Sequence, residues 1–276
     1  MDLRKKAYEI RKLALMAVHC ARSGHLGGSL GIAEILAVLY FGEMNVNPQN
    51  PEMPDRDRFV LSKGHGSASL YAVLALRGFF PLGDLEEFRQ IHGYLQGHPN
   101  MNDVPGVDMS TGSLGQGISA AVGMAVAAKL DGANYRVYSI LGDGELQEGQ
   151  VWEATMFAAH YKLDNLCAIV DNNGLQSDDR VEKVLSPYPI EAKFSAFSWN
   201  VISIDGHNID EVISALKAAR EVKDKPTVII AKTIKGKGVS FMENNPTWHV
   251  NVTNDEQYSQ ALAELNGAIE KCGMET

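Results

Sequence analysis

The sequence predicts an α/β fold, with a mostly parallel sheet covered by helices on both faces. Short apolar runs rich in β-forming residues recur along the chain, and longer segments with helical periodicity lie between them. Glycine, proline and asparagine mark many of the junctions. Such alternation builds a parallel sheet, because each crossover returns the chain to the same end of the sheet before the next strand begins.

The apolar patterns justify the expected elements in chain order. The segment 3–20 is an amphipathic helix rather than a signal peptide or a membrane span, since basic and acidic residues recur among its apolar ones. The segment 30–41 has an apolar helical pattern, and the helix at 118–130 is rich in Ala and Gly, which allows close packing. We expect strands at 59–61, 136–141, 166–171, 199–204 and 227–231, and helices at 3–20, 30–41, 67–77, 118–130, 148–161, 209–221 and 255–271.

Two stretches do not follow this pattern. Residues 79–110 are irregular and rich in Gly, Pro and Asn, and a loop of this length in a folded domain is usually functional. Residues 235–238 read Lys-Gly-Lys-Gly and predict a flexible loop. A chain of 276 residues lies at the upper end of what one domain normally holds, so we expect residues 1–276 to form a single domain.

Composition argues against several classes of function. A net charge of −9 argues against a nucleic-acid-binding surface, and no segment predicts a membrane span. Cys20, Cys167 and Cys272 are scattered without the spacing of a metal site, so we expect reduced, structural thiols and a cytoplasmic protein. An anionic substrate would require local basic groups that override the overall charge.

Two short motifs together predict a metal site. Residues 142–144 read Gly-Asp-Gly, and the pair Asn172-Asn173 follows after 27 intervening residues. Both follow expected strands, where ligands of open α/β sheets bind. Asp143, the amide oxygen of Asn173 and a main-chain carbonyl just beyond it suit Mg²⁺ (or Ca²⁺) that carries a diphosphate. Either motif alone is common and often only shapes a turn, so the prediction depends on their combination.

The glycine-rich run 112–117 opens the helix at 118–130. Its exposed amides would hydrogen-bond a phosphate or a pyrimidine edge, although a tight turn that only packs the helix is an equally ordinary explanation. The spacing of its glycines differs from the dinucleotide-binding motif, and no clear acidic residue follows at a strand end to hold a ribose.

Four histidines lie in glycine-rich or irregular segments, where imidazoles donate hydrogen bonds or move protons near neutral pH. Each one, taken alone, is also explained as a surface residue. They are His25, His65, His98 and His249. We expect the remaining histidines, His19, His92, His160 and His207, to be structural.

Several motifs, in this order, resemble the transketolase family of thiamine-diphosphate-dependent enzymes. They are Ser23-Gly24-His25, Leu61-Ser62-Lys63-Gly64-His65, Gly97-His98-Pro99, the run 111–117 and the run 142–149. The resemblance covers most of the chain, and several motifs in one order are more specific than any one of them. It implies the thiamine-diphosphate-binding fold and, within it, the diphosphate-binding domain.

The resemblance also implies roles for individual residues. Contacts to thiamine diphosphate would come from His65, Gly112, Ser113, Leu114, Gly144 and Asn173, and metal ligands from Asp143, Asn173 and the Leu175 carbonyl. Catalytic contacts would come from His25, His98, His249 and Glu148. Glu148 would link two active sites across a subunit interface, although a glutamate at a helix start also simply favours the helix dipole. The family usually has Gly after the last histidine, whereas this chain has Val250.

The resemblance also implies a partner. Transketolases activate the cofactor with a carboxylate from a pyrimidine-binding domain, and this sequence ends before such a domain. We therefore expect the amino-terminal subunit of a split transketolase, assembled as a heterotetramer with a separately encoded carboxy-terminal subunit. The enzyme would transfer a two-carbon ketol unit from a ketose phosphate to an aldose phosphate. The alternatives are the α subunit of a 2-oxo acid dehydrogenase, a deoxyxylulose-phosphate synthase fragment, and a non-catalytic cofactor-binding subunit.

Overall fold

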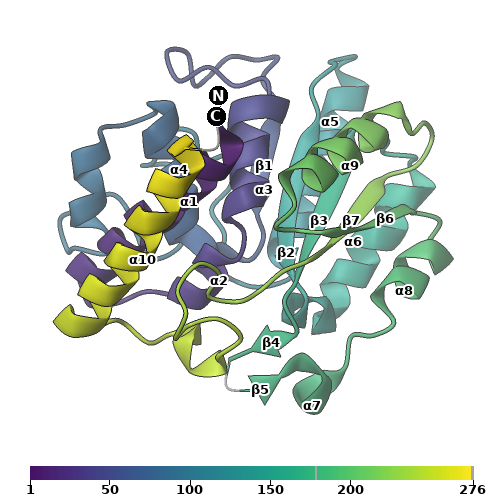
Figure 1. Cartoon of the computed structure of the whole chain (residues 1–276). Helices are drawn as coiled ribbons and strands as arrows, with labels where there is room; N and C mark the ends of the chain where they lie inside the picture. Colours follow the sequence, from purple (N-terminus) through teal and green to yellow (C-terminus); the bar gives the residue numbers. More distant parts are fainter. Residues whose placement is uncertain (178, 275–276) are drawn as a thin grey trace.

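A five-stranded parallel sheet forms the centre of the protein in the computed structural model, which describes residues 1–177 and 179–274 (Figure 1). Its strands are β1 (Arg58–Leu61), β2 (Val137–Gly142), β3 (Leu166–Asn172), β6 (Asn200–Asp205) and β7 (Thr227–Lys232). Their order across the sheet is β1-β2-β3-β7-β6, and every neighbouring pair is parallel. The predicted fold class is confirmed.

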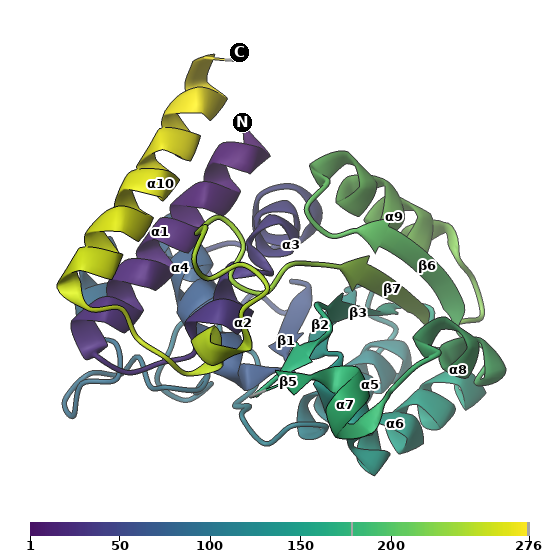
Figure 2. The same ribbon diagram turned by 60° about the horizontal axis from the view of Figure 1, so that its bottom comes forward.

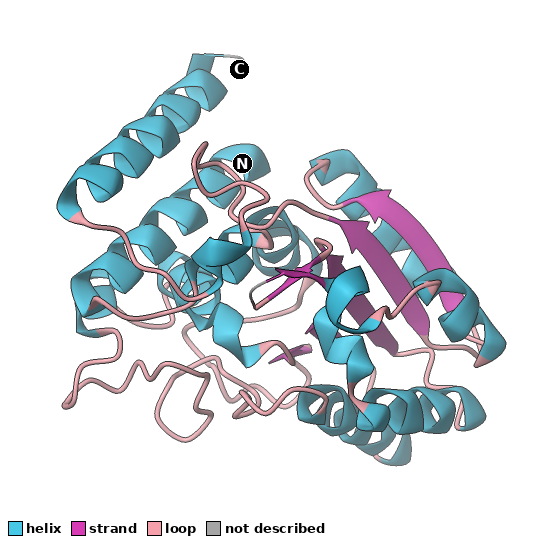
Figure 3. Ribbon diagram, turned by 90° about the horizontal axis from the view of Figure 1, so that it is seen from below, coloured by secondary structure: helices cyan, strands magenta, loops and turns pink. Residues whose placement is uncertain are grey.

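Successive residues of each strand point to opposite faces of the sheet and join two apolar cores. In β1, Phe59 and Leu61 belong to one core and Val60 belongs to the other. The first core contains residues of α1 (Leu3–Ala21), α2 (Leu26–Leu30), α3 (Ala33–Val38), α4 (Ser67–Arg77), α9 (Ile209–Glu221) and α10 (Asp255–Met274). The second contains residues of α5 (Gln116–Leu130), α6 (Gly149–His160) and α8 (Ile190–Ala196). Figure 3 shows strands between helices, and Figure 2 shows α10 beside α1.

Most expected elements are present, and two helices have the predicted bounds, at 67–77 and 209–221. The prediction of one helix over 30–41 is wrong. The chain there forms α2, α3 and a π-helical turn, Leu39–Glu43. At the junction between α2 and α3, a Cβ on Gly31 would lie 3.1 Å from the Ile234 carbonyl oxygen; within α2, one on Gly27 would lie 2.9 Å from that of Trp248.

Several short elements were not expected from the sequence. After β3 the chain forms a small antiparallel hairpin, in which Leu175 pairs with Arg180 and Gln176 pairs with Asp179. The hairpin strands and the turn of helix after them are β4 (Leu175–Gln176), β5 (Asp179–Arg180) and α7 (Val181–Leu185). Short 3₁₀ helices occupy Gly64–Gly66, Leu82–Glu87, Gly144–Gln147 and Pro246–His249. Most of the expected irregular stretch 79–110 has no regular structure.

Among the described residues, none of the helices combines the length and the apolarity that crossing a bilayer requires.

Candidate active site

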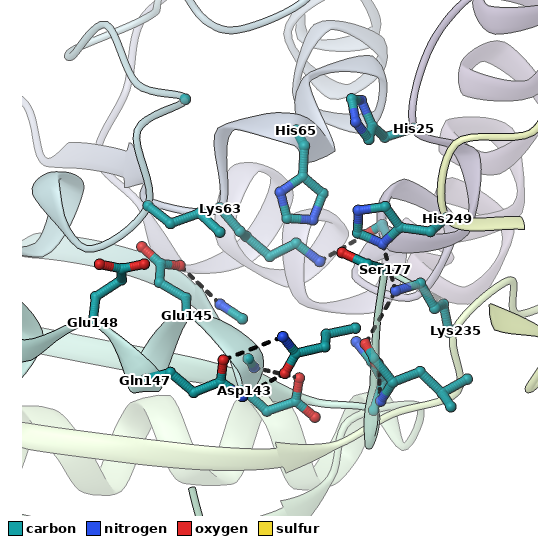
Figure 4. A pocket seen from close by; sticks show the side chains of 18 of the residues that line it. His25, Lys63, His65, Asp143, Glu145, Gln147, Glu148, Ser177, Lys235 and His249 are labelled. Atoms are coloured by element: carbon teal, nitrogen blue, oxygen red, sulfur yellow. Dashed lines mark hydrogen bonds between the residues drawn. The ribbon is translucent and has the colours of Figure 1, made fainter. Parts of the chain in front are cut away.

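A cleft of about 300 Å³ opens at the carboxyl ends of β1, β2 and β3, where open α/β sheets bind their ligands (Figure 4). With one exception, the structure brings the predicted site residues together here. They are His25, His65, His98, Gly112, Leu114, Asp143, Gly144, Glu148, Asn173, Leu175 and His249. The exception is Ser113, which is exposed and is not among the residues that line the cleft.

Asp143 follows β2 and joins the two loops of the predicted metal site. Its buried carboxylate accepts hydrogen bonds from the main-chain N–H groups of Gly144 (2.8 Å) and Gly174 (2.5 Å). Burial and the neighbouring Asp171 carboxylate raise the pKa of Asp143 to about 6, against the effect of these hydrogen bonds. A buried carboxylate of this kind is stabilised by an added cation.

The other two predicted ligands lie in the next loop. The side-chain oxygen of Asn173 accepts a hydrogen bond from the Leu175 N–H at 3.0 Å, and its amide nitrogen donates to Asp171 at 3.0 Å. The Leu175 carbonyl accepts from Lys235 Nζ at 3.1 Å. One carboxylate, one amide oxygen and one main-chain carbonyl suit a hard cation that shares its remaining positions with phosphate and water. Within the described part of the chain, no three or more His, Cys, Asp or Glu side chains are grouped to hold a metal.

Glycine lets two of the lining loops touch without side chains between them. Gly112 has a φ of +140°, and a Cβ there would lie 3.0 Å from the His98 ring. A Cβ on Gly64 would lie 2.6 Å from the Gly112 nitrogen. The loop after β1 and the loop before α5 therefore form one continuous wall of the cleft, in which larger residues would not fit.

Glu145 holds the loops of this wall together through hydrogen bonds. It was not identified from the sequence as a site residue. Its carboxylate is buried and accepts hydrogen bonds from Ser62 Oγ at 2.5 Å, Gly115 N at 2.9 Å and Gly142 N at 3.0 Å. The Gly115 amide is therefore occupied within the protein, so this member of the glycine-rich run is not available to a phosphate. Three successive loops of the cleft are tied together by one side chain.

Four histidine rings that are far apart in the sequence gather in the cleft. The His25 ring centroid lies 5.5 Å from those of His65 and His249 and 6.0 Å from that of His98. The His65 and His249 centroids are 5.2 Å apart. A cluster of this kind is unlike four independent surface residues.

The pKa values of the clustered imidazoles are all lowered. Burial, with the charge of Arg89 next in importance, lowers the pKa of His25 to about 4. Burial and the nearby Lys235 lower that of His249 to about 3. Burial also lowers the pKa of His98 and, more strongly, that of His65. At neutral pH these rings are neutral, so each offers one N–H donor and one acceptor nitrogen.

The last histidine occupies an ordinary backbone position despite the change from the family pattern. His249 ends the 3₁₀ turn Pro246–His249, and the next residue, Val250, has a φ of −123°. Because that conformation is open to any residue, glycine is not needed at this point. Lys235 Nζ lies 2.8 Å from His249 Nδ1.

Two buried lysines are functional candidates that sequence reasoning did not single out. Lys63 Nζ donates to the Gly28 carbonyl at 2.8 Å and contacts Asp171 Oδ2 at 2.5 Å. Burial and repulsion by Lys63 lower the pKa of Lys235 to about 8. Their signal in the sequence is a lysine just after each of two expected strands, in Ser62-Lys63-Gly64 and in the Lys-Gly-Lys-Gly run.

Glu148 lies at the edge of the cleft as the N-cap residue of α6. Its carboxylate is exposed and makes no hydrogen bond that caps the helix. Gly115 packs against it, since a Cβ on that glycine would lie 2.8 Å from Glu148 Cβ.

The histidines expected to be structural lie outside the cleft. His207 is held between Glu34, whose Oε2 is 3.0 Å from Nδ1, and the Ile234 N–H, which donates to Nε2 at 2.8 Å. His19 stacks on Tyr258 with ring centroids 3.9 Å apart. His92 and His160 are likewise absent from the cleft lining.

Comparison with known proteins agrees with this geometry. Residues 3–267 match the family model described as transketolase, thiamine diphosphate binding domain. The chain is 48% identical to a 6-deoxy-6-sulfo-D-fructose transketolase subunit from a Clostridium species, over 96% of both chains. It is 41% identical to an apulose-4-phosphate transketolase subunit from Phocaeicola vulgatus, covering 95% of this chain and 92% of the relative.

Solved structures give the same result. Transketolase from Campylobacter jejuni superposes with a TM-score of 0.90 at 36% identity, covering 98% of this chain. The chain spans 45% of the length of that transketolase. The matched region and the cleft residues together favour transketolase over the 2-oxo acid dehydrogenase and deoxyxylulose-phosphate synthase alternatives. The chain therefore belongs to the transketolase family, as its amino-terminal, thiamine-diphosphate-binding domain.

Proposed function

We propose that this chain is the amino-terminal subunit of a split transketolase that depends on thiamine diphosphate and Mg²⁺ (or Ca²⁺). Assembled with a pyrimidine-domain partner, it would transfer a two-carbon ketol unit from a ketose phosphate to an aldose phosphate. The observation that carries this proposal is the single cleft that joins the Asp143 metal loop to four neutral imidazoles. We also propose that residues 1–276 act as one diphosphate-binding domain in the cytoplasm.

The metal loop would hold the cofactor by its diphosphate. When bound, thiamine diphosphate supplies the carbon nucleophile and stabilises the carbanion left by carbon–carbon cleavage. The cation ligands would be Asp143, the Asn173 amide oxygen and the Leu175 carbonyl, and cofactor contacts would come from the predicted residues that line the cleft, His65, Gly112, Leu114, Gly144 and Asn173. The Leu175 carbonyl already accepts a hydrogen bond from Lys235, and its second lone pair would be available to the cation.

The imidazoles would orient substrate hydroxyls and move protons. A protonated Lys235 donates to His249 Nδ1, so the proton of the neutral His249 ring lies on Nε2, which remains a donor for a substrate oxygen. His25 and His98 would act on the same substrate, since the His25 ring centroid lies 5.5 Å from that of His249 and 6.0 Å from that of His98. Neutral rings suit this role, because each both gives and accepts a proton during the transfer.

A partner subunit would complete the active site. Relatives that match this chain over nearly their whole length are named as transketolase subunits, which supports a separate polypeptide for the remaining domains. That partner would bring the carboxylate for the aminopyrimidine ring and basic groups for the sugar phosphate. The Glu148 carboxylate is exposed and makes no hydrogen bond that caps α6. It is therefore available for an interface in which two heterodimers pair as a heterotetramer.

The test is a reconstitution assay. The purified chain would be mixed with xylulose 5-phosphate and ribose 5-phosphate, alone and then with the proposed pyrimidine-domain partner, and turnover would be followed by coupled oxidation of NADH. We expect no ketol transfer by the chain alone, and activity with tighter cofactor binding when the partner is added. Because one relative is named for a sulfonated ketose, 6-deoxy-6-sulfo-D-fructose belongs in the donor panel.

Each other outcome has a defined meaning. Turnover by the chain alone contradicts the split-enzyme proposal. Tight cofactor binding without turnover, across the donor panel and with the partner present, would instead indicate a non-catalytic subunit. Decarboxylation of pyruvate in place of ketol transfer would point to the chemistry of a 2-oxo acid dehydrogenase.

A further inference from the structure

A buried ion pair lies directly behind the proposed metal loop. Lys63, at the end of β1, is 1% exposed, and Asp171, near the end of β3, is fully buried. Lys63 Nζ and Asp171 Oδ2 are 2.5 Å apart, and the lysine also donates to the Gly28 carbonyl. Fully buried lysines and aspartates are uncommon and are not in themselves stabilising, so their presence here requires a specific explanation.

The aspartate of this pair controls the orientation of a proposed metal ligand. Asp171 Oδ2 accepts a hydrogen bond from the amide nitrogen of Asn173 at 3.0 Å, and Oδ1 accepts from the Thr233 hydroxyl. An ionised carboxylate only accepts hydrogen bonds, so a flipped Asn173 amide would place its oxygen against another oxygen. With the nitrogen held, the amide oxygen faces the Leu175 N–H, 3.0 Å away, and keeps a second lone pair for a cation.

The lysine keeps the aspartate in this position. Asp143 and Asp171 lie at the same end of the sheet, and a cation would attract both carboxylates. Lys63 and Thr233 hold the two oxygens of Asp171, which is not among the residues that line the cleft, whereas Asp143 is.

We propose that Lys63 and Asp171 are positioning residues that present the Asn173 oxygen to the cofactor's cation. This inference rests on the proposed function, because it requires Asn173 to be a metal ligand. A neutral, apolar replacement of the pair should leave the fold in place, since such replacements of buried ion pairs are often neutral or stabilising. It should nevertheless weaken cation binding by about tenfold or more, the usual effect of losing a residue that orients a ligand.

The experiment measures Mn²⁺ binding by electron paramagnetic resonance, with the full chain and excess thiamine diphosphate. The test variant is Lys63→Met/Asp171→Leu, which removes one charge of each sign and so leaves the net charge unchanged. The matched control is Arg56→Met/Asp108→Leu, which removes the ion pair next to the amino end of β1, where the two charged atoms are 2.7 Å apart. We expect the test variant to lose at least about tenfold in Mn²⁺ affinity and the control to lose none.

A second variant separates a positioning role from a purely electrostatic one. Lys63→Met alone removes a positive charge from the neighbourhood of the cation, so a purely electrostatic role predicts tighter Mn²⁺ binding, whereas positioning predicts weaker binding. Unchanged or tighter binding in a folded variant overturns the inference. Asp143→Ala tests the proposed metal site separately from the positioning role of Lys63 and Asp171. If this variant does not weaken Mn²⁺ binding, or if the parent chain binds no Mn²⁺, the proposed metal site is wrong and the inference is wrong with it.

Discussion

Replacing Glu34 with Gln should destabilise the protein at neutral pH, far from any cofactor contact. The Glu34 carboxylate is buried, lies 2.5 Å from Arg11 Nη2 and accepts a hydrogen bond from His207. Burial favours the neutral acid, but the Arg11 charge and the hydrogen bonds from His207 and Arg11 outweigh it and lower the pKa of Glu34 from 4.5 to about 2. That lowering corresponds to about 3 kcal/mol of stability at pH 7. Removing one partner of a buried ion pair usually lowers the free energy of unfolding by a similar amount, about 3–5 kcal/mol.

The sign of the effect sets the pH window. A carboxyl group whose pKa is lower in the folded state stabilises that state above its unfolded pKa and loses the contribution as the pH falls through the folded value. Urea denaturation should therefore show Glu34→Gln about 3 kcal/mol less stable than the parent at pH 7, with the gap closing between pH 4.5 and about 2.

The surface pair Lys6–Glu9, with both side chains 25% exposed, provides the control. Glu9→Gln should change the free energy of unfolding by at most about 1 kcal/mol, both at pH 7 and in the acidic range. A Glu34→Gln variant within about 1 kcal/mol of the parent at pH 7, or a gap that does not close in acid, would refute the reasoning.

Three further predictions concern the cleft. Asp143→Ala should abolish Mg²⁺-dependent retention of thiamine diphosphate in the assembled enzyme, and Asn173→Ala should weaken it, as measured by calorimetric titration; unchanged affinity in the Asp143 variant would contradict the metal assignment. His25→Ala and His98→Ala should keep cofactor affinity but lower kcat/KM, whereas an equal loss of cofactor binding would place these rings at the diphosphate instead. Because a cation requires ionised Asp143, whose pKa is about 6 in the protein alone, Mg²⁺ affinity should fall about tenfold per pH unit below that value. A flat affinity between pH 6 and 5 would show that Asp143 is not the ligand.

The parts of the fold that were predictable are those in which local pattern and tertiary packing agree. The strands are short apolar runs, and the helices at 67–77 and 209–221 keep their expected bounds. The segment 30–41 is apolar throughout, so its periodicity does not reveal where it breaks. Gly31, at the break, packs closely against the Ile234 carbonyl, more than 200 residues later in the chain, and local pattern cannot show such a contact.

The candidate site was predictable to a similar extent. Asp143 and Asn173 follow neighbouring strands, so their proximity follows from the rule that parallel strands end at one edge of the sheet. The Lys63–Asp171 pair joins residues 108 positions apart, and nothing local indicates which buried lysine meets which aspartate. The role of Glu145 was equally hard to predict, because its carboxylate accepts a hydrogen bond from the N–H of Gly115, 30 positions earlier in the chain.

The walls of the cleft also determine when the protein becomes able to bind its cofactor. His25 comes from the start of the chain, and Lys235 and His249 come from its last fifth, so the binding site does not exist until nearly the whole chain has folded. Any ligand that fills the cleft therefore stabilises the complete native state and no partly folded one. During synthesis the segments that precede Lys235 would emerge and collapse without help from the cofactor. Cofactor binding would then occur only after Lys235 and His249 have folded into the cleft.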